Sequence, residues 1–349
     1  MPDKPLRAAI VGAGTLLGKA LADELARSPL GSADLRLLDA GEEAGRLTAA
    51  GEEVTLIQPV DAASFSGCEF VFFAATAEVT RTYWRAALDA GCRLVDLSGE
   101  LERSGGALVR AALLPDEPGA AVPDLQTRAV ASAHPMAILL GLLQGRLTRV
   151  AALRSVWATL LQPAAEYGQP ALEELHRQTT NLLSFQPMPD AVFGGQIAFS
   201  LRATLGEVPA INLAATSATI GRHLHLIAPQ LLPAALQLIQ APVFHGYGIS
   251  AGIELERPLD LAAVQAALAG PLLSVIADSA DFPGSVQAVE ERDAQVLVRA
   301  VPQTASGNGA SDSTRYWCWM IADNLTLAVQ NGVACAMELN RLRPRGAVQ

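Results

Sequence analysis

The sequence has 349 residues, enough for two domains, and half of them are hydrophobic, enough to fill two buried cores. Its net charge of −10 and its isoelectric point near 5.0 argue against nucleic acid as a partner, because a phosphate backbone would be repelled. No apolar run is long enough to cross a bilayer and the first residues do not resemble a signal peptide, so we expect a cytoplasmic protein without a membrane partner.

The chain begins with a strand, a glycine-rich turn and a helix. Residues 6–11 form a short apolar run, the turn contains Gly12, Gly14 and Gly18, and apolar residues then recur at helical spacing. Such a turn lets the backbone approach a pyrophosphate at a helix N-terminus, which is the physical basis of dinucleotide binding. The alternative is a tight turn that serves only the packing of the helix on the strand.

The second strand, residues 34–39, ends in an acid that bears on the choice of cofactor. In a dinucleotide-binding fold, an acid at the place of Asp39 accepts hydrogen bonds from a ribose 2′-OH and repels a 2′-phosphate. Arg46 would instead favour the phosphate. Asp39 is also compatible with a solvated turn residue, so NAD and NADP both remain candidates.

Strands and helices continue to alternate in the first third of the chain. We expect strands at 53–57, 69–74 and 93–97, and a helix over 79–90 that stops at Gly91. This alternation is typical of a parallel sheet with both faces covered. Residues 104–123, rich in Gly, Pro and Ala, form a connection.

A strand-to-helix elbow lies within residues 130–143, where a strand-like run meets Pro135 and becomes an apolar, helix-forming run. Such an elbow presents its first helical residue to a cleft and points the free N–H groups of the helix at whatever binds there. Enzymes often place a nucleophile at that spot. Here the position holds Ala137.

The rest of the chain indicates an α+β domain. We expect helices over 137–147 and 171–183, a mobile loop over 303–313, and a final helix over 325–342 that packs back against the first domain. Strand-like segments recur at 153–161, 211–218, 239–244, 248–256, 285–290, 295–301 and 316–322. The expected fold class is α/β. Residues 1–133 plus 324–349 form a Rossmann-like parallel-sheet domain, and residues 134–323 form a catalytic and dimerisation domain with a mainly antiparallel sheet.

Seven motifs in a fixed order give the chain a resemblance to a known family. They are the turn at 12–18, Asp96-Leu-Ser98-Gly, the elbow at Pro135, Gln162-Pro-Ala-Ala, Phe193-Gly-Gly-Gln196-Ile-Ala-Phe199, Gln240-Ala-Pro-Val-Phe-His-Gly-Tyr247 and Asp323-Asn324-Leu325. On these motifs the chain resembles the aspartate-semialdehyde dehydrogenases, and more narrowly their Usg-type branch, over nearly its whole length. The resemblance implies a homodimer that pairs through the sheet of the second domain and residues 193–199.

In that family an acyl phosphate is reduced, or the aldehyde is oxidised in the presence of phosphate, through a thioester on a cysteine and hydride exchange with NADP. The resemblance puts Ala137 at the nucleophile, Gln240 at the arginine that holds the substrate carboxylate, and Tyr247 at the histidine base. Only Gln162, which helps to orient the acyl group, keeps the family residue. An alanine methyl cannot form a thioester, so we expect the family reaction to be lost.

The resemblance also implies a nicotinamide cofactor, NADP or NAD, and no metal. The cofactor-binding candidates are Gly12, Gly14, Thr15, Leu16, Gly18, Asp39 and Ser98. The family turn reads Gly-Ala-Thr-Gly, whereas Thr15 here places a side chain where the second glycine would let the pyrophosphate come close. The family's phosphate-binding arginine falls on Glu102, with Arg103 adjacent.

A metal centre finds little support in the sequence. His223 and His225 would share one face if their segment were a strand, and His245 and Tyr247 have the same spacing. No acidic or cysteine ligand has a matching spacing, and the four cysteines are scattered, which argues against zinc and against disulfides. We therefore expect these histidines to be satisfied structural groups.

A hydrolase is also disfavoured, because Ser132 and His134 lack the sharp turn that surrounds a hydrolase nucleophile. Two hypotheses remain. The first is a homodimeric binding or scaffolding protein that has lost the family reaction. The second is an active NAD(P)-dependent oxidoreductase whose substrate needs no thioester; for this hypothesis Asp39 favours NAD(H).

Overall fold

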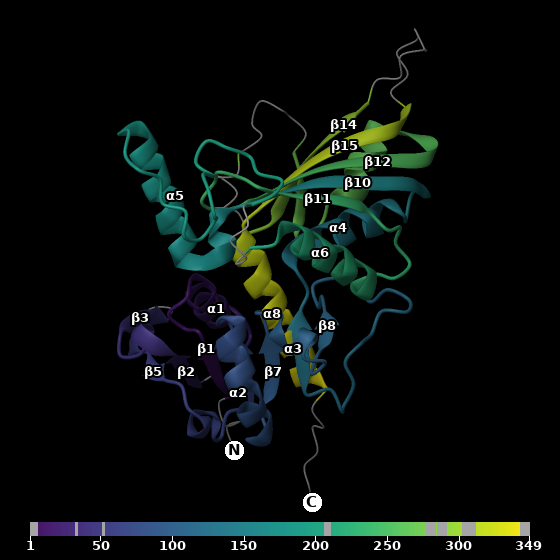
Figure 1. Ribbon diagram of the computed structural model, residues 1–349. Coiled ribbons are helices and arrows are strands. Elements are labelled where there is room, and N and C mark those ends of the chain that lie inside the picture. The colour runs from purple at the N-terminus through teal and green to yellow at the C-terminus, as the bar shows by residue number, and fades with distance from the viewer. Residues whose placement is uncertain are drawn as a thin grey trace, which may run out of the picture. The chain divides into compact units, whose positions relative to one another are not determined.

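The computed structural model describes residues 6–31, 34–50, 53–205, 211–276, 284, 292–301 and 312–342 (Figure 1). The chain divides into two compact units. Unit 1 comprises Met1–Asp116, Ala120–Ala133 and Ala328–Gln349, and unit 2 comprises Glu117–Gly119 and His134–Leu327. Among the helices that the structure describes, none is long and apolar enough to cross a membrane.

Unit 1 is built on a parallel sheet of seven strands in the order β5-β2-β1-β6-β7-β9-β8. The strands are β1 (Arg7–Val11), β2 (Asp34–Asp39), β5 (Gln58–Pro59), β6 (Phe70–Phe73), β7 (Arg93–Asp96), β8 (Leu108–Arg110) and β9 (Ala129–Ser132). Every residue of β6 is buried, which is expected of a central strand covered on both faces. The predicted parallel sheet is confirmed.

Helices supply the two cores on either side of this sheet. On one side pack α1 (Leu16–Arg27) and α8 (Asn324–Arg341), with Leu21, Val329 and Leu339 in a shared apolar cluster. On the other side packs α2 (Ala77–Asp89). The prediction that the final helix returns to the first domain is therefore confirmed.

One predicted strand of the first domain lies outside the main sheet. The segment expected at 53–57 forms β4 (Glu53–Leu56), which pairs antiparallel with β3 (Leu47–Ala50) and with no strand of the seven. Leu47 and Leu56 of this hairpin are largely exposed. The remaining short elements of unit 1 are η1 (Gly41–Glu43), η2 (Ala62–Phe65) and α3 (Glu100–Arg103).

Unit 2 contains a six-stranded sheet in the order β11-β10-β12-β15-β14-β13. The strands are β10 (Leu153–Gln162), β11 (Ala235–Gln240), β12 (Tyr247–Asp260), β13 (Leu273–Val275), β14 (Ala294–Ala300) and β15 (Asp312–Ala322). The three inner pairs are antiparallel and the two edge pairs are parallel. The predicted, mainly antiparallel sheet is thus confirmed.

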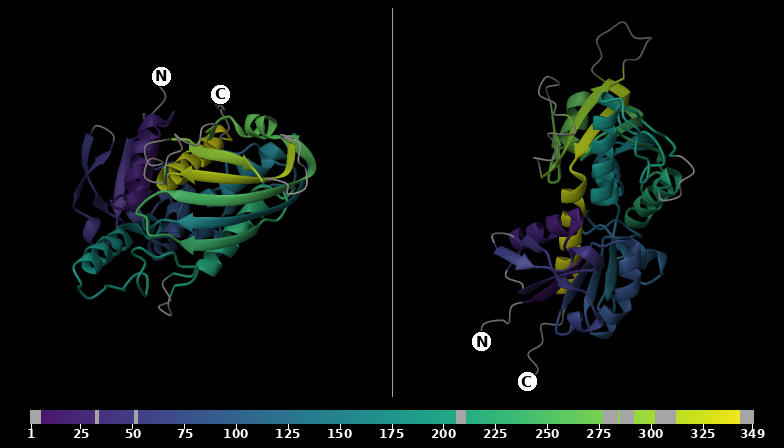
Figure 2. Two further views of the ribbon diagram at one scale, coloured as in Figure 1. Left: turned by 90° about the horizontal axis from the view of Figure 1, so that it is seen from above. Right: turned by 60° about the vertical axis from the view of Figure 1, so that its left-hand side comes forward.

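One face of this sheet is covered by helices α4 (Pro135–Leu147), α6 (Leu213–Ile227) and α7 (Leu261–Leu268), which contact β10, β11 and β14 respectively (Figures 1 and 2). Helix α4 is apolar and almost entirely buried, as a helix in the middle of a core must be. Helix α5 (Gly168–Leu183) follows η3 (Ala164–Tyr167).

The strand predicted at 211–218 is wrong, because this segment begins helix α6. Asn212 caps the helix by accepting a hydrogen bond from the backbone N–H of Ala215 at 2.9 Å, and buried Ile220, Leu224 and Ile227 recur at helical spacing. The segment expected at 239–244 is only partly a strand, since β11 ends at Gln240. The strand predicted at 285–290, and residues 303–311 of the predicted loop, lie outside the described residues.

Candidate functional site

The glycine-rich turn of unit 1 joins β1 to α1 and needs glycine at two of its positions. Gly12 has φ +93°, and a Cβ there would lie 2.6 Å from the backbone nitrogen of Ala75. A Cβ on Gly18 would lie 2.0 Å from the carbonyl oxygen of Gly12. The glycines therefore allow the close contact of helix, turn and strand that a dinucleotide-binding turn requires.

Thr15 is the N-cap of α1, and its hydroxyl faces the turn. Its Oγ1 lies 2.8 Å from the carbonyl oxygen of Gly12 and 3.0 Å from that of Ala74, and it accepts the N–H of Gly18 at 2.9 Å. The N–H groups of Leu16 and Leu17 have no partner within the described part of the chain. Two donors at the helix N-terminus thus stay available to an anion.

Asp39, at the end of β2, is buried against this turn. Its carboxylate accepts the N–H of Gly14 at 2.7 Å through Oδ2 and the N–H of Ala40 at 2.8 Å through Oδ1. Glu43 lies beside the same glycine, and its Oε1 forms an ion pair of 2.6 Å with Arg46. The cation that the sequence offered for a 2′-phosphate is therefore already paired.

Ser98 belongs to a tight polar loop that begins at the end of β7. Its hydroxyl donates to Oδ1 of Asp96 at 2.6 Å, and this carboxyl also accepts the N–H of Leu101. Burial raises the pKa of Asp96. Ser98 is thus held by its own loop.

Arg103, the residue next to the family's phosphate-binding position, lies near this loop. Arg103 points its guanidinium at Glu100, 3.3 Å away, and Glu100 also forms a two-bond ion pair with Arg81. The hydrogen bond with Arg81 is the main reason that the pKa of Glu100 is lowered to about 2. Arg103 therefore forms an ion pair with Glu100. Its position next to Glu102 had suggested a guanidinium that is free to bind a phosphate.

The elbow of unit 2 begins helix α4 at Pro135, as the sequence predicts. His134 is the N-cap: its Nδ1 accepts the N–H of Met136 at 3.2 Å, and its carbonyl oxygen accepts the N–H groups of Ala137 at 2.9 Å and Ile138 at 3.2 Å. Pro135 has no N–H to offer. The expectation that this helix presents free N–H groups to a ligand is therefore wrong, because His134 takes them all.

Three of the four positions that the resemblance assigns to catalysis meet at one end of the sheet. Gln162 is the last residue of β10, Gln240 is the last of β11, and Tyr247 is the first of the antiparallel strand β12. The parallel register pairs Gln162 directly with Gln240. Ala137, the fourth position, is completely buried in α4.

The two glutamines are bonded to each other. Gln162 Nε2 donates to Gln240 Oε1 at 3.0 Å and also to the hydroxyl of Tyr167, while Gln240 Nε2 donates to the carbonyl oxygens of Gln162 at 3.2 Å and Ala241 at 3.1 Å. Both glutamines are buried. The amide nitrogens of Gln162 and of Gln240, which stands at the family arginine's position, thus both donate to other groups of the protein.

Tyr247 has a carboxylate as its partner. Its hydroxyl donates to Glu166 Oε2 at 2.6 Å, and Glu166 Oε1 lies 3.5 Å from Nε2 of His134. Burial favours the neutral acid, but His134 and Tyr247 outweigh it, so that the pKa of Glu166 lies below its ordinary value. Burial also raises the pKa of Tyr247 well above its ordinary value, which keeps the phenol protonated.

His223 completes this cluster from helix α6. Its Nδ1 accepts the backbone N–H of His134 at 2.8 Å, and burial is the main cause that lowers its pKa to about 3. Because the segment is a helix, His223 is buried while His225 is exposed, so the two do not share a face as a strand would require. Within the described ranges, no three His, Cys, Asp or Glu side chains are grouped as metal ligands would be.

Sequence reasoning missed Glu166 and Tyr167. Both follow Gln162 within η3, and the signal that was available is an acid and a phenol placed directly after the one retained catalytic residue. Nothing local shows that Glu166 meets Tyr247, which is 81 residues away in the chain.

None of the chain's four cysteines stands where a nucleophile is needed. All four are buried and free of disulfides. Burial raises the pKa of the Cys68 thiol, that of Cys92 to about 11, and those of Cys318 and Cys335 to about 12. At neutral pH these thiols are protonated and inaccessible, which makes each of them inert.

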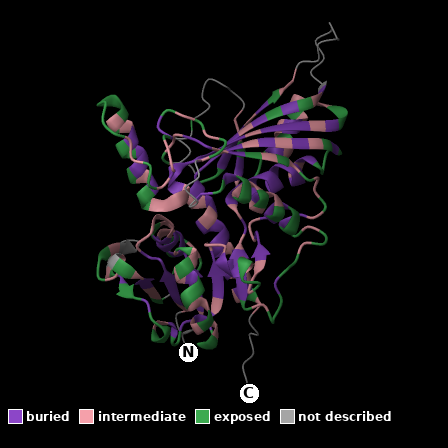
Figure 3. Cartoon of the chain, in the orientation of Figure 1, coloured by how far each residue is buried: buried purple, intermediate pink, exposed green. Residues whose placement is uncertain are grey.

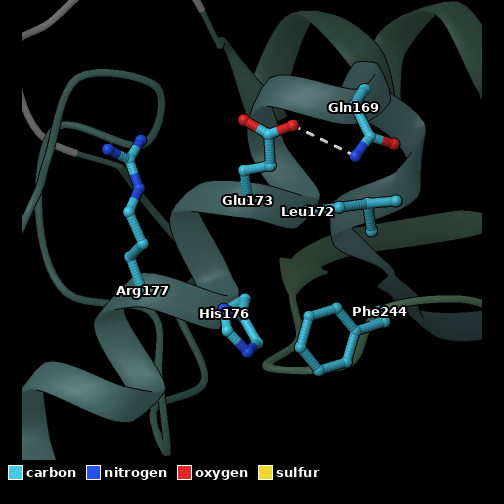
Figure 4. Close-up of a pocket in the computed structure, with 6 residues that line it drawn as sticks. All are labelled: Gln169, Leu172, Glu173, His176, Arg177 and Phe244. Atoms are coloured by element: carbon cyan, nitrogen blue, oxygen red, sulfur yellow. Dashed lines mark hydrogen bonds between the residues drawn. The ribbon is translucent and has the colours of Figure 1, made fainter.

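A shallow cavity of about 410 Å³ lies on helix α5, away from these positions (Figure 4). It is lined by Gln169, Leu172, Glu173, His176, Arg177 and Phe244. Gln169 donates to Glu173 at 3.1 Å along the helix, and none of the predicted site residues reaches the cavity.

The parallel sheet with its glycine-rich turn and the second unit with its elbow define a two-unit fold of the dehydrogenase type. Residues 7–130 match the family model described as the NAD binding domain of semialdehyde dehydrogenase. The chain is 31% identical to a USG-1 protein homolog of Pseudomonas aeruginosa, over 92% of this chain and 94% of the relative. It is 29% identical to a USG-1 protein homolog of Azotobacter vinelandii, over 91% of this chain and 92% of the relative.

Among solved structures, a probable aspartate-semialdehyde dehydrogenase from Pseudomonas aeruginosa is 30% identical, with a TM-score of 0.82, over 97% of this chain and 99% of that one. The chain therefore belongs to the aspartate-semialdehyde dehydrogenase family, in its USG-1-like branch.

Proposed function

We propose that this chain has lost the family reaction and acts as a dimeric binding or scaffolding protein. The observation that carries the proposal is the buried methyl of Ala137 at the elbow, together with four cysteines that are all buried and protonated. A thioester route needs a thiolate that the substrate can reach. The described residues supply no such thiolate.

The other catalytic positions support the same proposal. Gln240 and Tyr247 are each tied into a buried hydrogen-bonded pair, so neither offers a cation to a substrate carboxylate or a base to a thiol. Restoring the family residue at one of these positions would not restore the site. Glu166 and Tyr167 form hydrogen bonds with the residues that are now present, Tyr247 and Gln162 respectively.

The direct test is the phosphate-dependent oxidation of aspartate semialdehyde, followed by the absorbance of NADH or NADPH. We expect no rate above a heat-denatured blank with either cofactor. A steady rate that falls in a Gln162→Ala variant would contradict the proposal. Glu173→Gln, on the exposed face of α5, serves as the control substitution, since it leaves the elbow untouched.

We further propose that unit 1 binds a nicotinamide dinucleotide. The residues present fit such a group: the N–H groups of Leu16 and Leu17 would hold the pyrophosphate, and Asp39 would hold the adenosine ribose. A nicotinamide cofactor supplies hydride transfer when it is bound. Calorimetric titration with NADH and NADPH should give saturable heat with at least one of them, and no heat with either would remove this part of the proposal.

The dimer is proposed to form through the face of the unit 2 sheet opposite α4, α6 and α7, which the left view of Figure 2 looks onto. Register places Trp157, Gly252 and Trp317 side by side on this face, with the two indole rings 6.0 Å apart and edge-to-face. Along β10, part-exposed residues of this face alternate with buried residues of the core (Figure 3).

Glycine makes this surface flat enough to be covered. A Cβ on Gly252 would lie 2.1 Å from the ring of Trp157, and one on Gly248 would lie 2.9 Å from the ring of Trp319. The rings of Trp157 and Trp319 therefore pack directly on the backbone of these glycines. Trp317 is 45% exposed, although the open side of a sheet in a monomer usually carries polar residues. In the predicted contact region 193–199, Phe193 is buried and Phe199 is exposed.

Light scattering at micromolar concentration tests the dimer. The wild-type protein should have twice the mass of one chain, and Trp317→Lys should shift it to the mass of one chain because a charge would be buried at the centre of the contact. Leu125→Lys replaces a similarly exposed apolar residue of unit 1 and should leave the dimer intact. A monomeric wild-type protein would contradict the proposal.

A second candidate function is an oxidoreductase that acts on a carbonyl or alcohol without a thioester. The specific observation in its favour is the chain of Tyr247, Glu166 and His134, which brings a phenol, a carboxylate and an imidazole together. Its test is cofactor turnover with a panel of small aldehydes and alcohols. Turnover that is lost in Tyr247→Phe would favour this candidate over the binding protein, and the absence of turnover with every compound would count against it.

A further inference from the structure

Two carboxylates converge on a single glycine of the turn in unit 1. Asp39 reaches the N–H of Gly14 directly, at 2.7 Å. Glu43 lies against the other side of the same residue: a Cβ built on Gly14 would be 2.7 Å from Glu43 Cβ and 2.8 Å from Glu43 Oε2. Asp39 comes from the end of the second strand and Glu43 from the short 3-10 helix that follows it.

Arg46, which follows Glu43 in the same loop, is already paired. Arg46 Nη1 is held by Glu43 Oε1 at 2.6 Å, so the pair contributes little net charge, and among the described residues no cation forms an ion pair with Asp39. Asp39 is also fixed in place, because its two oxygens each accept one backbone N–H, from Gly14 and from Ala40. It cannot turn away from a ligand without leaving two backbone donors without a partner.

The adenosine ribose of a dinucleotide lies against an acid in this place of the fold. A free 2′-hydroxyl donates a hydrogen bond to such an acid, whereas a 2′-phosphate brings up to two negative charges next to it. We propose that Glu43 makes this chain select NAD(H) against NADP(H), because it holds Arg46 in an ion pair and so keeps that cation from a 2′-phosphate beside Asp39. This inference rests on the proposal that unit 1 binds a dinucleotide.

Glu43 is the sharper test of the pair, because it is a surface residue whose loss leaves the turn intact. In the wild-type protein, calorimetry should show NADH binding at least on the order of tenfold tighter than NADPH, as expected for one unscreened like-charge contact. Glu43→Gln should tighten NADPH binding by roughly threefold to tenfold and leave NADH unchanged, because it removes one negative charge and releases Arg46.

A double-mutant cycle separates these two effects of Glu43. Arg46→Ala alone should weaken NADPH binding by about twofold to threefold, because it leaves the exposed Glu43 carboxylate without its partner. In the Glu43→Gln background, the same Arg46→Ala change should remove most of the gain. The gain should also shrink as salt is added, which a change of shape would not produce.

The proposal is overturned if the wild-type protein binds NADPH as tightly as NADH, or if Glu43→Gln weakens both cofactors equally. It is equally overturned if neither cofactor binds. The readout is affinity alone, so these results are independent of whether aspartate semialdehyde is turned over. Equal binding of both cofactors would overturn the selectivity alone, whereas no binding of either would overturn the proposed dinucleotide binding as well.

Discussion

The two helix N-termini that the sequence offered as binding sites differ in how their N–H groups are used. At α1 in unit 1, Thr15 takes one donor and leaves those of Leu16 and Leu17 without a partner in the described chain. At α4 in unit 2, His134 accepts every available N–H of the first turn with its ring and its carbonyl. The same local motif is thus ready for an anion in one unit and closed in the other.

This difference supports the proposal that the chain has lost one function of the family and kept another. The turn of unit 1 is constrained by backbone geometry, which the glycines preserve. The elbow of unit 2 depended on the chemistry of side chains, and those side chains now bond to one another. Buried polar side chains that bond to one another stabilise a fold, while an active site must keep some of its groups free for a substrate. In this cluster His134 Nε2 is buried 3.5 Å from Glu166 Oε1, without a hydrogen-bond partner in the part of the chain that the structure describes.

The largest expected effect is that of a methyl group at Gly18. Gly18→Ala places a Cβ 2.0 Å from the Gly12 carbonyl oxygen, so the helix must move away from the turn. We expect a loss of about 3 kcal/mol or more in the free energy of unfolding, together with the loss of dinucleotide binding. Urea denaturation measures the first and calorimetry the second.

Gly195→Ala is the matched control, since a Cβ there meets nothing within 4 Å. It should leave both quantities unchanged. A Gly18→Ala protein with wild-type stability and wild-type affinity would show that the turn is not constrained as described.

Restoring the family arginine should harm unit 2. Gln240→Arg puts a guanidinium where two amides now satisfy each other in a buried place, with no carboxylate bonded to either amide. We expect a loss of about 3 kcal/mol, the usual cost of an unpaired buried charge. Gln169→Arg, at an exposed position of α5, should change stability by less than about 0.5 kcal/mol. Equal stability of the two variants in urea would contradict the view that the buried side chains of unit 2 are bonded to one another, unlike the free N–H groups at the turn of unit 1.

The parts of the fold and of the candidate site that the sequence predicts are those fixed by residues close together in the chain. Gly12, Gly18 and Pro135 act within a few residues, and they located both the turn and the elbow. Helix α6 was not predicted because the small and β-branched residues after Asn212 also suit a strand. The signal for the helix is Asn212 itself, which caps its first turn. The pairing of Glu166 with Tyr247 depends on contacts between distant segments, which no local pattern reports.

The stability of unit 2 should depend on pH through His223. Its folded-state pKa of about 3 lies below the ordinary value near 6.5, so the unfolded chain binds a proton that the folded chain does not. Stability is therefore complete above pH 6.5 and falls as the pH drops through the window between the two values, by up to about 1.4 kcal/mol per pH unit.

His223→Gln keeps an acceptor for the N–H of His134 but cannot titrate. Denaturation of both proteins between pH 4 and pH 7 should show a shallower dependence for the variant. Parallel curves for the two proteins would mean that His223 is accessible to protons in the folded state.

The smallest expected effect comes from returning the nucleophile alone. Ala137→Cys adds one sulfur atom at a buried position and should cost about 1 kcal/mol, the lower end of the range for an added core atom. No activity should appear, because Tyr247 is a phenol bonded to Glu166 and cannot take the thiol proton. The aspartate semialdehyde assay checks this, and measurable turnover by the single variant would show that the elbow is still a working site.

The most direct test of the central claim is the intact mass of the wild-type protein after incubation with aspartate semialdehyde and both oxidised cofactors in the absence of phosphate. Without phosphate, an enzyme that uses the family route would accumulate its acyl thioester. Because Ala137 offers no thiol and all four cysteines are buried, we expect the mass to stay unchanged. An acyl adduct that maps to any cysteine and disappears when phosphate is added would contradict the account.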